Sequence, residues 1–495
     1  IRYEAIRAIH DLDLPVAQKA LAAHLDRYLS GEGVRPPENH IDQIIQLRLL
    51  NANFRLGKKE NAARLLTYAA NPKLPELCRD QALAALAEWP SPLPVDAVVG
   101  IHRPLDPAQR EDITEVVREG LSKVFDNAGG HLLARALKLA LQYEAPAPAD
   151  LLTKELGNVK SDPESRAAAL RLLASRNADL LAPMIDGLLK DQAPVLRAEM
   201  VKVLLGSDPD RGLAAALALG QTGNLRDRQN AHALLAKVPG ERASQWFATA
   251  LDDLQAGREP EGSRLDLLEA AAERGEPDIK AHLDRWNQSL DPADPLAAYR
   301  PTLAGGDADR GREIFNTHAA AQCAKCHRVN GGEGGEAGPD LGDIAKRQPP
   351  DYRLMSLVNP SAVVVPGYGI MLVTLKDGTS LGGTMMEENP QNITLKVPNP
   401  ENASELIQKK IPVADIASRT PPVSAMPPMT ALLTKREMRD VLAYLDTLPG
   451  EAPVGAHLFG ADPEAFADAA RAIAADGRFA LIDINCGCPV RKVVR

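Results

Sequence analysis

The stretch from Cys323 to His327 reads Cys-Ala-Lys-Cys-His and combines three side chains that could do chemistry together. The spacing C-x-x-C-H is typical of covalent attachment of a c-type haem. Two thiols three residues apart on one helical turn can each add to a haem vinyl group, and the histidine that follows can bind the iron. Because the same thiol spacing also serves zinc sites and thiol–disulfide exchange, both chemistries remain alternatives at this point.

Two helices and two loops must position these residues. Residues 306–315 predict a short helix capped by Asp307, and residues 434–448 predict a longer helix that begins with a capping box. A glycine-rich loop follows the motif and ends in the turn Gly-Pro-Asp-Leu at 338–341, and a second loop, Ser-Ala-Met-Pro-Pro-Met at 424–429, precedes the last helix. We expect both loops to face the motif between the two helices.

The methionines after the motif differ in their surroundings. Several fall on the core face of a predicted helix or in a strand pattern, namely Met355, Met371, Met385 and Met438. This leaves Met426 and Met429, in the loop before the last helix, as the methionines free to act as a ligand.

At these positions the chain resembles class I cytochromes c. In that family the proline carbonyl of a G-P-x-L turn orients the proximal histidine, which implies that Pro339 accepts a hydrogen bond from His327. The family places an M-P distal methionine just before the last helix, which implies Met426 as the second axial ligand, with Met429 as the alternative. The resemblance therefore implies one haem c, attached through Cys323 and Cys326. It also implies that the last helix crosses the first one, with Gly311 permitting their close approach. A His/Met pair leaves no open position on the iron, which favours electron transfer.

The segment between the haem motif and Met426 is longer than a minimal cytochrome c requires. Residues 370–381 alternate around the turn Asp377-Gly378, a strong hairpin signal, and residues 393–397 alternate again. We predict a small β-barrel-like insertion over about 367–419 within a cytochrome c domain of 305–450. A cytochrome c with such an insertion behind helical repeats resembles the haem-binding, membrane-bound dehydrogenase-like proteins of planctomycetes and verrucomicrobia.

The first part of the chain predicts a helical solenoid. Arginines recur every 31 residues and each opens an amphipathic stretch, at Arg135, Arg166, Arg197 and Arg228, with Arg79 as an earlier member. A unit of this length has room for two helices that bury their apolar faces only against neighbouring units. The pattern resembles HEAT-type repeats over 1–290, followed by a proline-rich linker at 291–304. The histidines here are scattered, and Cys78 is predicted to be a buried, inert thiol.

The last segment, 451–495, is expected to be a partial βα-barrel piece. A linker is followed by a predicted helix capped by Asp462 and by an apolar strand at 480–484. Two motifs, Phe-Gly-Ala-Asp-Pro-Glu at 459–464 and Asp-Ile-Asn-Cys-Gly-Cys-Pro-Val-Arg-Lys-Val at 483–493, resemble tRNA-dihydrouridine synthases. In that family the loop equivalent to Asn485 lies near the flavin and substrate. The catalytic cysteine of that family has no counterpart here, so we expect this piece to be inert. Cys486 and Cys488 are weak candidates for a metal site or a strained disulfide.

Composition limits the choice of compartment and partner. The chain has 495 residues, a net charge of −9 and only 4% aromatic residues, which argues against a nucleic-acid partner and favours helices. No signal peptide is visible, and the chain starts inside a helical pattern, so we interpret it as a fragment. Covalent haem attachment in bacteria takes place outside the cytoplasmic membrane, so the motif predicts a periplasmic or other extracytoplasmic location. A tRNA-modifying enzyme is cytosolic, and this conflict suggests a joined or misassembled reading frame.

Together these features predict a mainly α protein: a HEAT-like solenoid, then an all-α cytochrome c domain with a small β insertion. The predicted function is electron transfer through one covalent haem, from a dehydrogenase domain or protein to a soluble or membrane acceptor. No complete catalytic site is visible. The alternatives are the C-terminal part of a quinone- or flavin-linked sugar or alcohol dehydrogenase, a repeat scaffold with a vestigial haem site, and a fusion with tRNA-dihydrouridine synthase.

Overall fold

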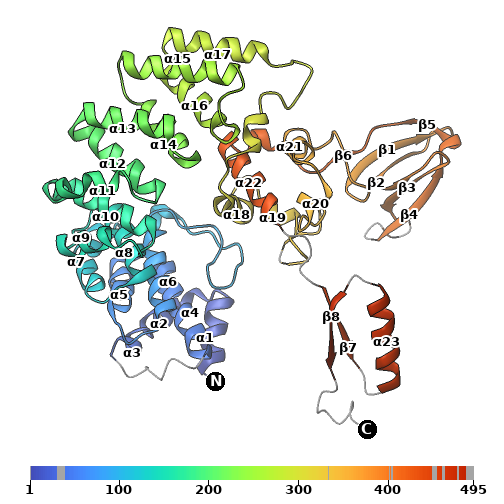
Figure 1. The fold of residues 1–495 in the computed structure, drawn as a ribbon. Coiled ribbons are helices and arrows are strands. Elements are labelled where there is room, and N and C mark those ends of the chain that lie inside the picture. The colour runs from blue at the N-terminus through green and yellow to red at the C-terminus, as the bar shows by residue number, and fades with distance from the viewer. Residues whose placement is uncertain are drawn as a thin grey trace. The chain divides into compact units, whose positions relative to one another are not determined.

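The computed structural model (Figure 1) describes residues 2–30, 40–332, 334–400, 402, 405–448, 454–459, 463–476 and 479–485. The chain divides into two compact units, Ile1–Val238 and Pro239–Arg495. The described part of the chain contains no helix that is both long enough and apolar enough to cross a membrane.

The first unit consists of helices. They are α1 (Arg2–Asp11), α2 (Pro15–Ala23), α3 (Asp26–Leu29), α4 (His40–Leu56), α5 (Lys59–Ala70), α6 (Glu76–Ala87), α7 (Thr114–Phe125), α8 (Gly130–Gln142), α9 (Ala149–Gly157), α10 (Pro163–Arg176), α11 (Ile185–Leu188), α12 (Pro194–Ser207), α13 (Pro209–Thr222) and α14 (Leu225–Leu235). Alternate helices α4, α6, α8, α10, α12 and α14 each contact the next member of this series and form one continuous layer. Helices α5 and α7, which are likewise separated by one helix in the chain, also contact each other. The order supports stacked helical pairs, whereas the specific HEAT assignment remains a prediction.

The periodic arginines bond the helices of this layer either to one another or to the helix that precedes them. The Arg79 Nε of α6 donates to the Ala69 carbonyl oxygen at 2.7 Å, and the Arg166 Nε of α10 donates to the Leu156 carbonyl oxygen at 3.0 Å. Each bond satisfies a carbonyl at the end of the preceding helix, which has no partner within that helix. The others pair with Asp side chains or with carbonyls in the last turn of the preceding helix, namely Arg135 with Asp80, Arg197 with Asp227, and Arg228 with Gly220 and Gln221 of α13. The sequence repeat therefore marks a repeated inter-helix bond.

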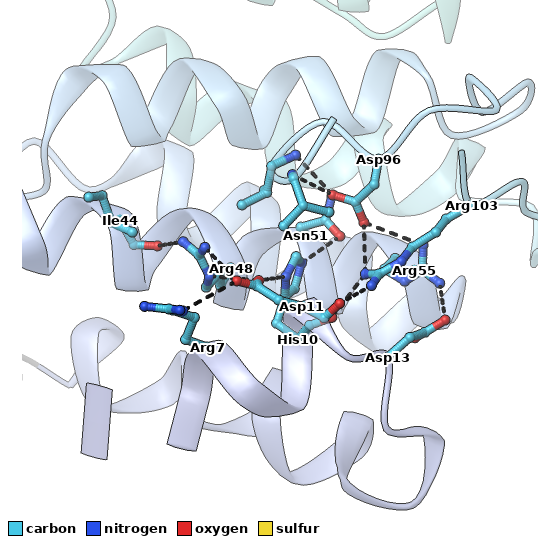
Figure 2. Close-up of polar contacts among 12 residues, drawn as sticks. Arg7, His10, Asp11, Asp13, Ile44, Arg48, Asn51, Arg55, Asp96 and Arg103 are labelled. Atoms are coloured by element: carbon cyan, nitrogen blue, oxygen red, sulfur yellow. Dashed lines mark hydrogen bonds and ion pairs between the residues drawn. The ribbon is translucent and has the colours of Figure 1, made fainter. Parts of the chain in front are cut away.

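A buried polar network joins α1 to α4 in the first unit (Figure 2). His10 is fully buried, and its ring nitrogens contact Asp11 Oδ1 at 2.8 Å and Asn51 Oδ1 at 3.1 Å. Arg48 binds both carboxylate oxygens of Asp11, at 2.9 Å each. This histidine therefore has structural partners on both sides, as expected for the scattered histidines of this region. Next to it, Asp96 accepts from the backbone N–H groups of two residues of its own loop.

Substituting Asp11 by Asn should destabilise the first unit. Burial raises the pKa of Asp11, but the hydrogen bonds and charges of Arg48 and His10 outweigh burial and hold this pKa below its ordinary value. The carboxylate therefore contributes stability above about pH 4, and this contribution is lost as the pH falls through the lower pKa of the folded state. We expect Asp11→Asn to lower the free energy of unfolding by about 1–3 kcal/mol at pH 7.

Hydrogen exchange of the α1 and α4 amides measures this effect. The matched control is Asp26→Asn, because Asp26 also pairs with an arginine, Arg64, but is 54% exposed. An exposed pair contributes less than about 1 kcal/mol. An equal loss of unfolding free energy in the two variants would contradict this prediction. So would a loss in Asp11→Asn that is as large at pH 3 as at pH 7.

The helices of the second unit are α15 (Glu241–Gln255), α16 (Arg264–Arg274), α17 (Pro277–Ser289), α18 (Ala308–Thr317), α19 (Cys323–Cys326), α20 (Ile344–Arg347), α21 (Pro350–Val358), α22 (Lys435–Thr447) and α23 (Pro463–Asp476). Helices α15, α16 and α17 contact one another, and α16 also bonds to α22 through the buried pair Asp266–Arg439. The last helices of the predicted repeat region thus belong to the same compact unit as the haem motif.

Helices α18 and α22 cross closely, as the sequence predicts. A Cβ atom at Gly311 would lie 1.9 Å from the carbonyl oxygen of Asp440, so only glycine fits at the crossing. The rings of Phe315 and Tyr444 pack beside it with centroids 5.6 Å apart. Both predicted caps are present: Asp307 accepts from a backbone N–H at the start of α18, and α22 begins with a complete capping box.

The β insertion is an open antiparallel sheet, not the barrel-like structure predicted from the sequence. Its strands are β1 (Gly369–Leu375), β2 (Ser380–Glu388), β3 (Asn392–Pro398), β4 (Leu406–Pro412), β5 (Ile416–Arg419) and β6 (Val423–Ser424). The order is β4-β3-β2-β1-β5, with β6 also paired to β1. The sheet does not close into a barrel, because the strands at the two ends of this order do not pair with each other. Strand β4 pairs with β3, and β5 pairs with β1. The predicted hairpin is β1–β2, and β6 extends the sheet beyond the predicted boundary.

The described part of the last segment forms one βαβ unit. Strand β7 (Val454–Phe459) pairs in parallel with β8 (Phe479–Asn485), and α23 connects them. The helix and the second strand agree with the sequence prediction, whereas β7 begins within the segment that the sequence predicts to be a linker. Asp462, Cys486 and Cys488 lie outside the described residues, and Asn485 is the last residue of β8.

Candidate haem site

The predicted site residues line one cavity in the second unit. The cavity has an empty volume of about 1380 Å³, including the part open to solvent. Its wall includes all five residues predicted to bind the haem, and the alternative methionine: Cys323, Cys326, His327, Pro339, Met426 and Met429. Helices α18 and α22 contribute Phe315, Val441 and Leu445, so two segments far apart in sequence enclose the same space. The wall is largely apolar, as expected of a site that excludes water from a cofactor.

The two thiols occupy the ends of the one-turn helix α19. Gln322, just before it, has φ = 47°, and this left-handed residue starts the turn sharply after α18. Cys323 packs partly against the core, and burial raises the pKa of its thiol. Cys326 is exposed, and both thiols are free. One turn of helix thus presents two thiols to the cavity rim.

His327 is held in one orientation by the turn beneath it. Its Nδ1 lies 2.8 Å from the carbonyl oxygen of Pro339, as the family resemblance implies. A carbonyl can only accept, so Nδ1 carries the proton and Nε2 keeps its lone pair for a metal. Burial lowers the pKa of His327, which favours the neutral ring, although the bond to Pro339 partly opposes it. A Cβ at Gly338 would lie 2.5 Å from Cε1 of the ring, so this turn requires glycine.

Asp340 closes the glycine-rich loop, a role that its position in the sequence does not predict. Its carboxylate accepts three backbone N–H groups, from Asn330 at 3.0 Å, Gly331 at 2.7 Å and Gly342 at 2.8 Å. The loop is therefore fixed at both ends around the proline that orients His327. The only sequence signal was an acidic residue inside the Gly-Pro-Asp-Leu turn, and nothing in its spacing identified the partners.

Substituting Asp340 by Asn should loosen this loop and weaken the haem domain. Burial raises the pKa of Asp340, but its three backbone N–H partners outweigh burial and keep the pKa below its ordinary value. Its contribution is present above about pH 4 and disappears as the pH falls through the lower folded-state pKa. At pH 7 we expect Asp340→Asn to lower the free energy of unfolding of the second unit by about 1–3 kcal/mol, as measured by urea unfolding.

Glu336→Gln is the control within the same loop. Glu336 pairs with Arg328 at 2.8 Å but is 75% exposed, so its loss should cost less than about 1 kcal/mol. If Asp340→Asn unfolds at the same urea concentration as the control, the three bonds do not stabilise the loop.

The two candidate methionines differ in burial. Met426 is half-buried and its backbone N–H bonds to the Ser424 hydroxyl at 3.1 Å. Met429 is only 2% exposed and belongs to the core between the helices. The other methionines lie where predicted: Met438 in the core of α22, Met355 on α21, and Met371 and Met385 in the core of the sheet. The cavity wall thus includes a half-buried thioether and a fully packed one.

The donor set fits a haem better than the alternatives. Two thiols at the rim, an imidazole with a free Nε2 and a thioether all line one apolar cavity. Within the described ranges, no group of three or more His, Cys, Asp or Glu side chains is arranged to hold a metal ion, and a closed zinc site needs four such ligands.

The crossing of α18 and α22, the one-turn helix α19 and the apolar cavity define a cytochrome c domain. In agreement, the cytochrome c family model matches residues 308–372, which include the haem motif and the 338–341 turn but end before Met426. The dihydrouridine synthase (Dus) family model matches residues 420–495. That match includes α22, although the apolar face of α22 packs against α18 in the cytochrome core.

Proposed function

We propose that this chain transfers electrons through one covalently attached haem c, with His327 and Met426 as the axial ligands. The observation that carries the proposal is the convergence of both thiols, the oriented imidazole and the Met426 thioether on a single apolar cavity. A cytochrome c domain supports haem-based electron transfer and an extracytoplasmic location. We propose that the donor is a dehydrogenase domain or protein and that the acceptor is soluble or membrane-bound.

The residues of the chain have separate tasks in this proposal. The thiols of Cys323 and Cys326 fix the cofactor covalently, and Pro339 keeps the His327 ring in the tautomer that leaves Nε2 free. The apolar wall excludes water. This lowers the solvent reorganisation energy when the haem iron gains or loses an electron. The haem supplies a one-electron couple. Two protein ligands leave no position for a substrate, which favours electron transfer over oxygen chemistry.

We further propose that the helices before the haem domain form a HEAT-type scaffold that presents it to the donor. The alternating helix contacts of the first unit support this reading. The repeated arginine bonds support it as well, because each ties one helix of the layer to a neighbouring segment.

A second candidate function rests on the dihydrouridine synthase match at 420–495. The parallel βαβ unit of β7, α23 and β8 is a building block of a βα barrel. Against this candidate, α22 lies within the matched range but contributes its apolar face to the cytochrome core. Titration of the purified chain with FMN, followed by flavin fluorescence, tests the candidate: saturable quenching would support it.

A pyridine haemochrome spectrum tests the leading proposal. Protein matured with the haem-attachment machinery should show a c-type α-band, and the Cys323→Ser/Cys326→Ser variant should lose it. Cys78→Ser is the matched control, because Cys78 is also a free cysteine but is fully buried in the first unit. Absence of a c-type band in the unmodified protein would overturn the proposal.

A further inference from the structure

We propose that Asn330 and Gly331 form a modification site, at which the asparagine side chain is converted to aspartate or isoaspartate, and that Asp340 controls the rate of this conversion. These two residues are the only Asn-Gly pair in the sequence, and both are exposed. They follow His327 closely in the chain and belong to the loop that Asp340 closes. This chemistry is independent of the haem and goes beyond the proposed function.

An asparagine followed by glycine can react with its own backbone. The Gly331 nitrogen loses its proton and forms a bond to Cγ of Asn330, the Cγ–Nδ2 bond breaks, and ammonia leaves. Water then opens the resulting succinimide ring at either carbonyl, which leaves aspartate or isoaspartate at position 330. Because glycine has no Cβ to hinder the attack, this pair reacts faster than a pair with a larger second residue. The conversion needs only water.

The attacking nitrogen is held by Asp340. The Gly331 N–H donates to Oδ2 of Asp340 at 2.7 Å, and the Asn330 N–H donates to Oδ1 at 3.0 Å. While these bonds last, the Gly331 nitrogen keeps its proton, and the negative charge that it must acquire would develop next to a carboxylate. Like charges so close together repel each other. The closed loop therefore opposes the first step of the reaction.

The side chain under attack is confined as well. Asn330 has a left-handed backbone conformation, with φ = 54°, and Gly331 follows with φ = 66°. A Cβ atom at Gly342 would lie 1.9 Å from Oδ1 and 2.7 Å from Cγ of Asn330, so the amide group lies against the Gly342 backbone. Gly342 in turn donates its N–H to Asp340 at 2.8 Å. One carboxylate thus holds the attacking nitrogen and the backbone that confines the side chain.

The conversion must therefore pass through an open state of this loop. Loops open locally at a lower free energy than that required to unfold the whole protein. When opening is fast and reversible, the observed rate follows the population of the open state. Removing the carboxylate raises this population, so Asp340→Asn should speed the conversion by about 5–150-fold, which corresponds to a loss of about 1–3 kcal/mol.

The product cannot restore the native loop. Either product adds a negative charge beside the Asp340 carboxylate, and isoaspartate also lengthens the backbone by one carbon atom between the two N–H groups that bind it. Repulsion between these charges weakens the closure of the loop, whose Pro339 orients His327. The converted protein should therefore lose hydrogen-exchange protection at the Gly331 and Gly342 amides.

The experiment follows Asn330 by peptide mapping and mass spectrometry in the full chain, aged at mildly alkaline pH. The native protein is compared with the same chain unfolded in guanidinium chloride, and with Asp340→Asn and Glu336→Gln. We expect slow conversion in the native chain, fast conversion in the unfolded chain, and an intermediate rate in Asp340→Asn. Glu336→Gln should react at the native rate, because the ion pair that it removes, with Arg328, is exposed.

Arg439→Met separates local opening of the loop from global unfolding. This change removes a buried bond between α16 and α22, so it should destabilise the second unit but leave the rate at Asn330 close to the native one. Equal acceleration in Arg439→Met and Asp340→Asn would mean that global unfolding sets the rate, and would overturn the inference. Conversion of the native chain as fast as the unfolded chain would overturn it too, as would a native rate in Asp340→Asn.

Gly342→Ala decides the matter if Asp340→Asn does not fold. The added Cβ would displace the Asn330 side chain but keep the Asp340 carboxylate. We expect faster conversion in this variant, because the amide group is no longer confined. A native rate in Gly342→Ala would overturn the inference.

Discussion

Met426→Ala is expected to abolish the near-infrared sulfur–iron band of the oxidised protein and to lower its midpoint potential, without releasing the haem. The haem should stay attached because Cys323, Cys326 and His327 are intact. Loss of a thioether removes the ligand that raises the potential of a His/Met centre. Met426 is favoured as this ligand because its side chain is only half-buried and lines the cavity, so it can turn toward the iron without disrupting the core.

Met429→Ala is the matched control and should behave in the opposite way. Met429 is 2% exposed and packs between the helices. Its truncation should retain the near-infrared band but lower the free energy of unfolding by about 2–5 kcal/mol, as for other buried methionines. The reverse pattern, with the band lost only in Met429→Ala, would assign the iron ligand to Met429 and refute the prediction for Met426.

Local chemistry made much of the haem domain predictable from its sequence. The two caps, the Asp377-Gly378 hairpin and the close helix crossing at Gly311 each depend on neighbouring residues or on one glycine, and all are present. The turn that bonds His327 came from a family resemblance, and the bond to Pro339 is present. The caps and the hairpin need no knowledge of distant partners, whereas the helix crossing joins residues far apart in the chain and was expected from one glycine and the family resemblance.

Other features that depend on partners elsewhere in the chain were not predicted. The carboxylate of Asp340 bonds backbone N–H groups about ten residues earlier in the chain, and Arg353 pairs with Asp446 of α22. Neither partner follows from periodicity. Whether the sheet closes into a barrel depends on whether its two end strands pair with each other. The alternation of apolar and polar residues along each strand does not determine this. The periodic arginines were visible, but their acceptors were not.

Arg439→Met is expected to cause a large loss of stability in the second unit. The Arg439 Nη1 lies 2.6 Å from Oδ2 of Asp266, and both side chains are almost fully buried. Removing one member of a buried ion pair leaves an uncompensated charge in a poorly solvated place, which costs about 3–5 kcal/mol. The neighbouring Arg436 also contacts Asp266, at 2.9 Å, but it is 40% exposed and cannot replace the buried partner.

Urea unfolding of the haem-loaded protein measures this loss, and two comparisons sharpen it. Arg312→Met removes a pair with Asp309 whose members are 63% and 91% exposed, so it should cost less than about 1 kcal/mol. Asp266→Asn combined with Arg439→Met should cost less than the sum of the two single changes, since each single change already breaks the same pair. Because α22 also forms one wall of the haem cavity, helices α15–α17 and the haem domain should lose protection in hydrogen exchange together. Separate unfolding of the two parts, or strict additivity in the double variant, would show that this pair does not couple the helices to the haem domain.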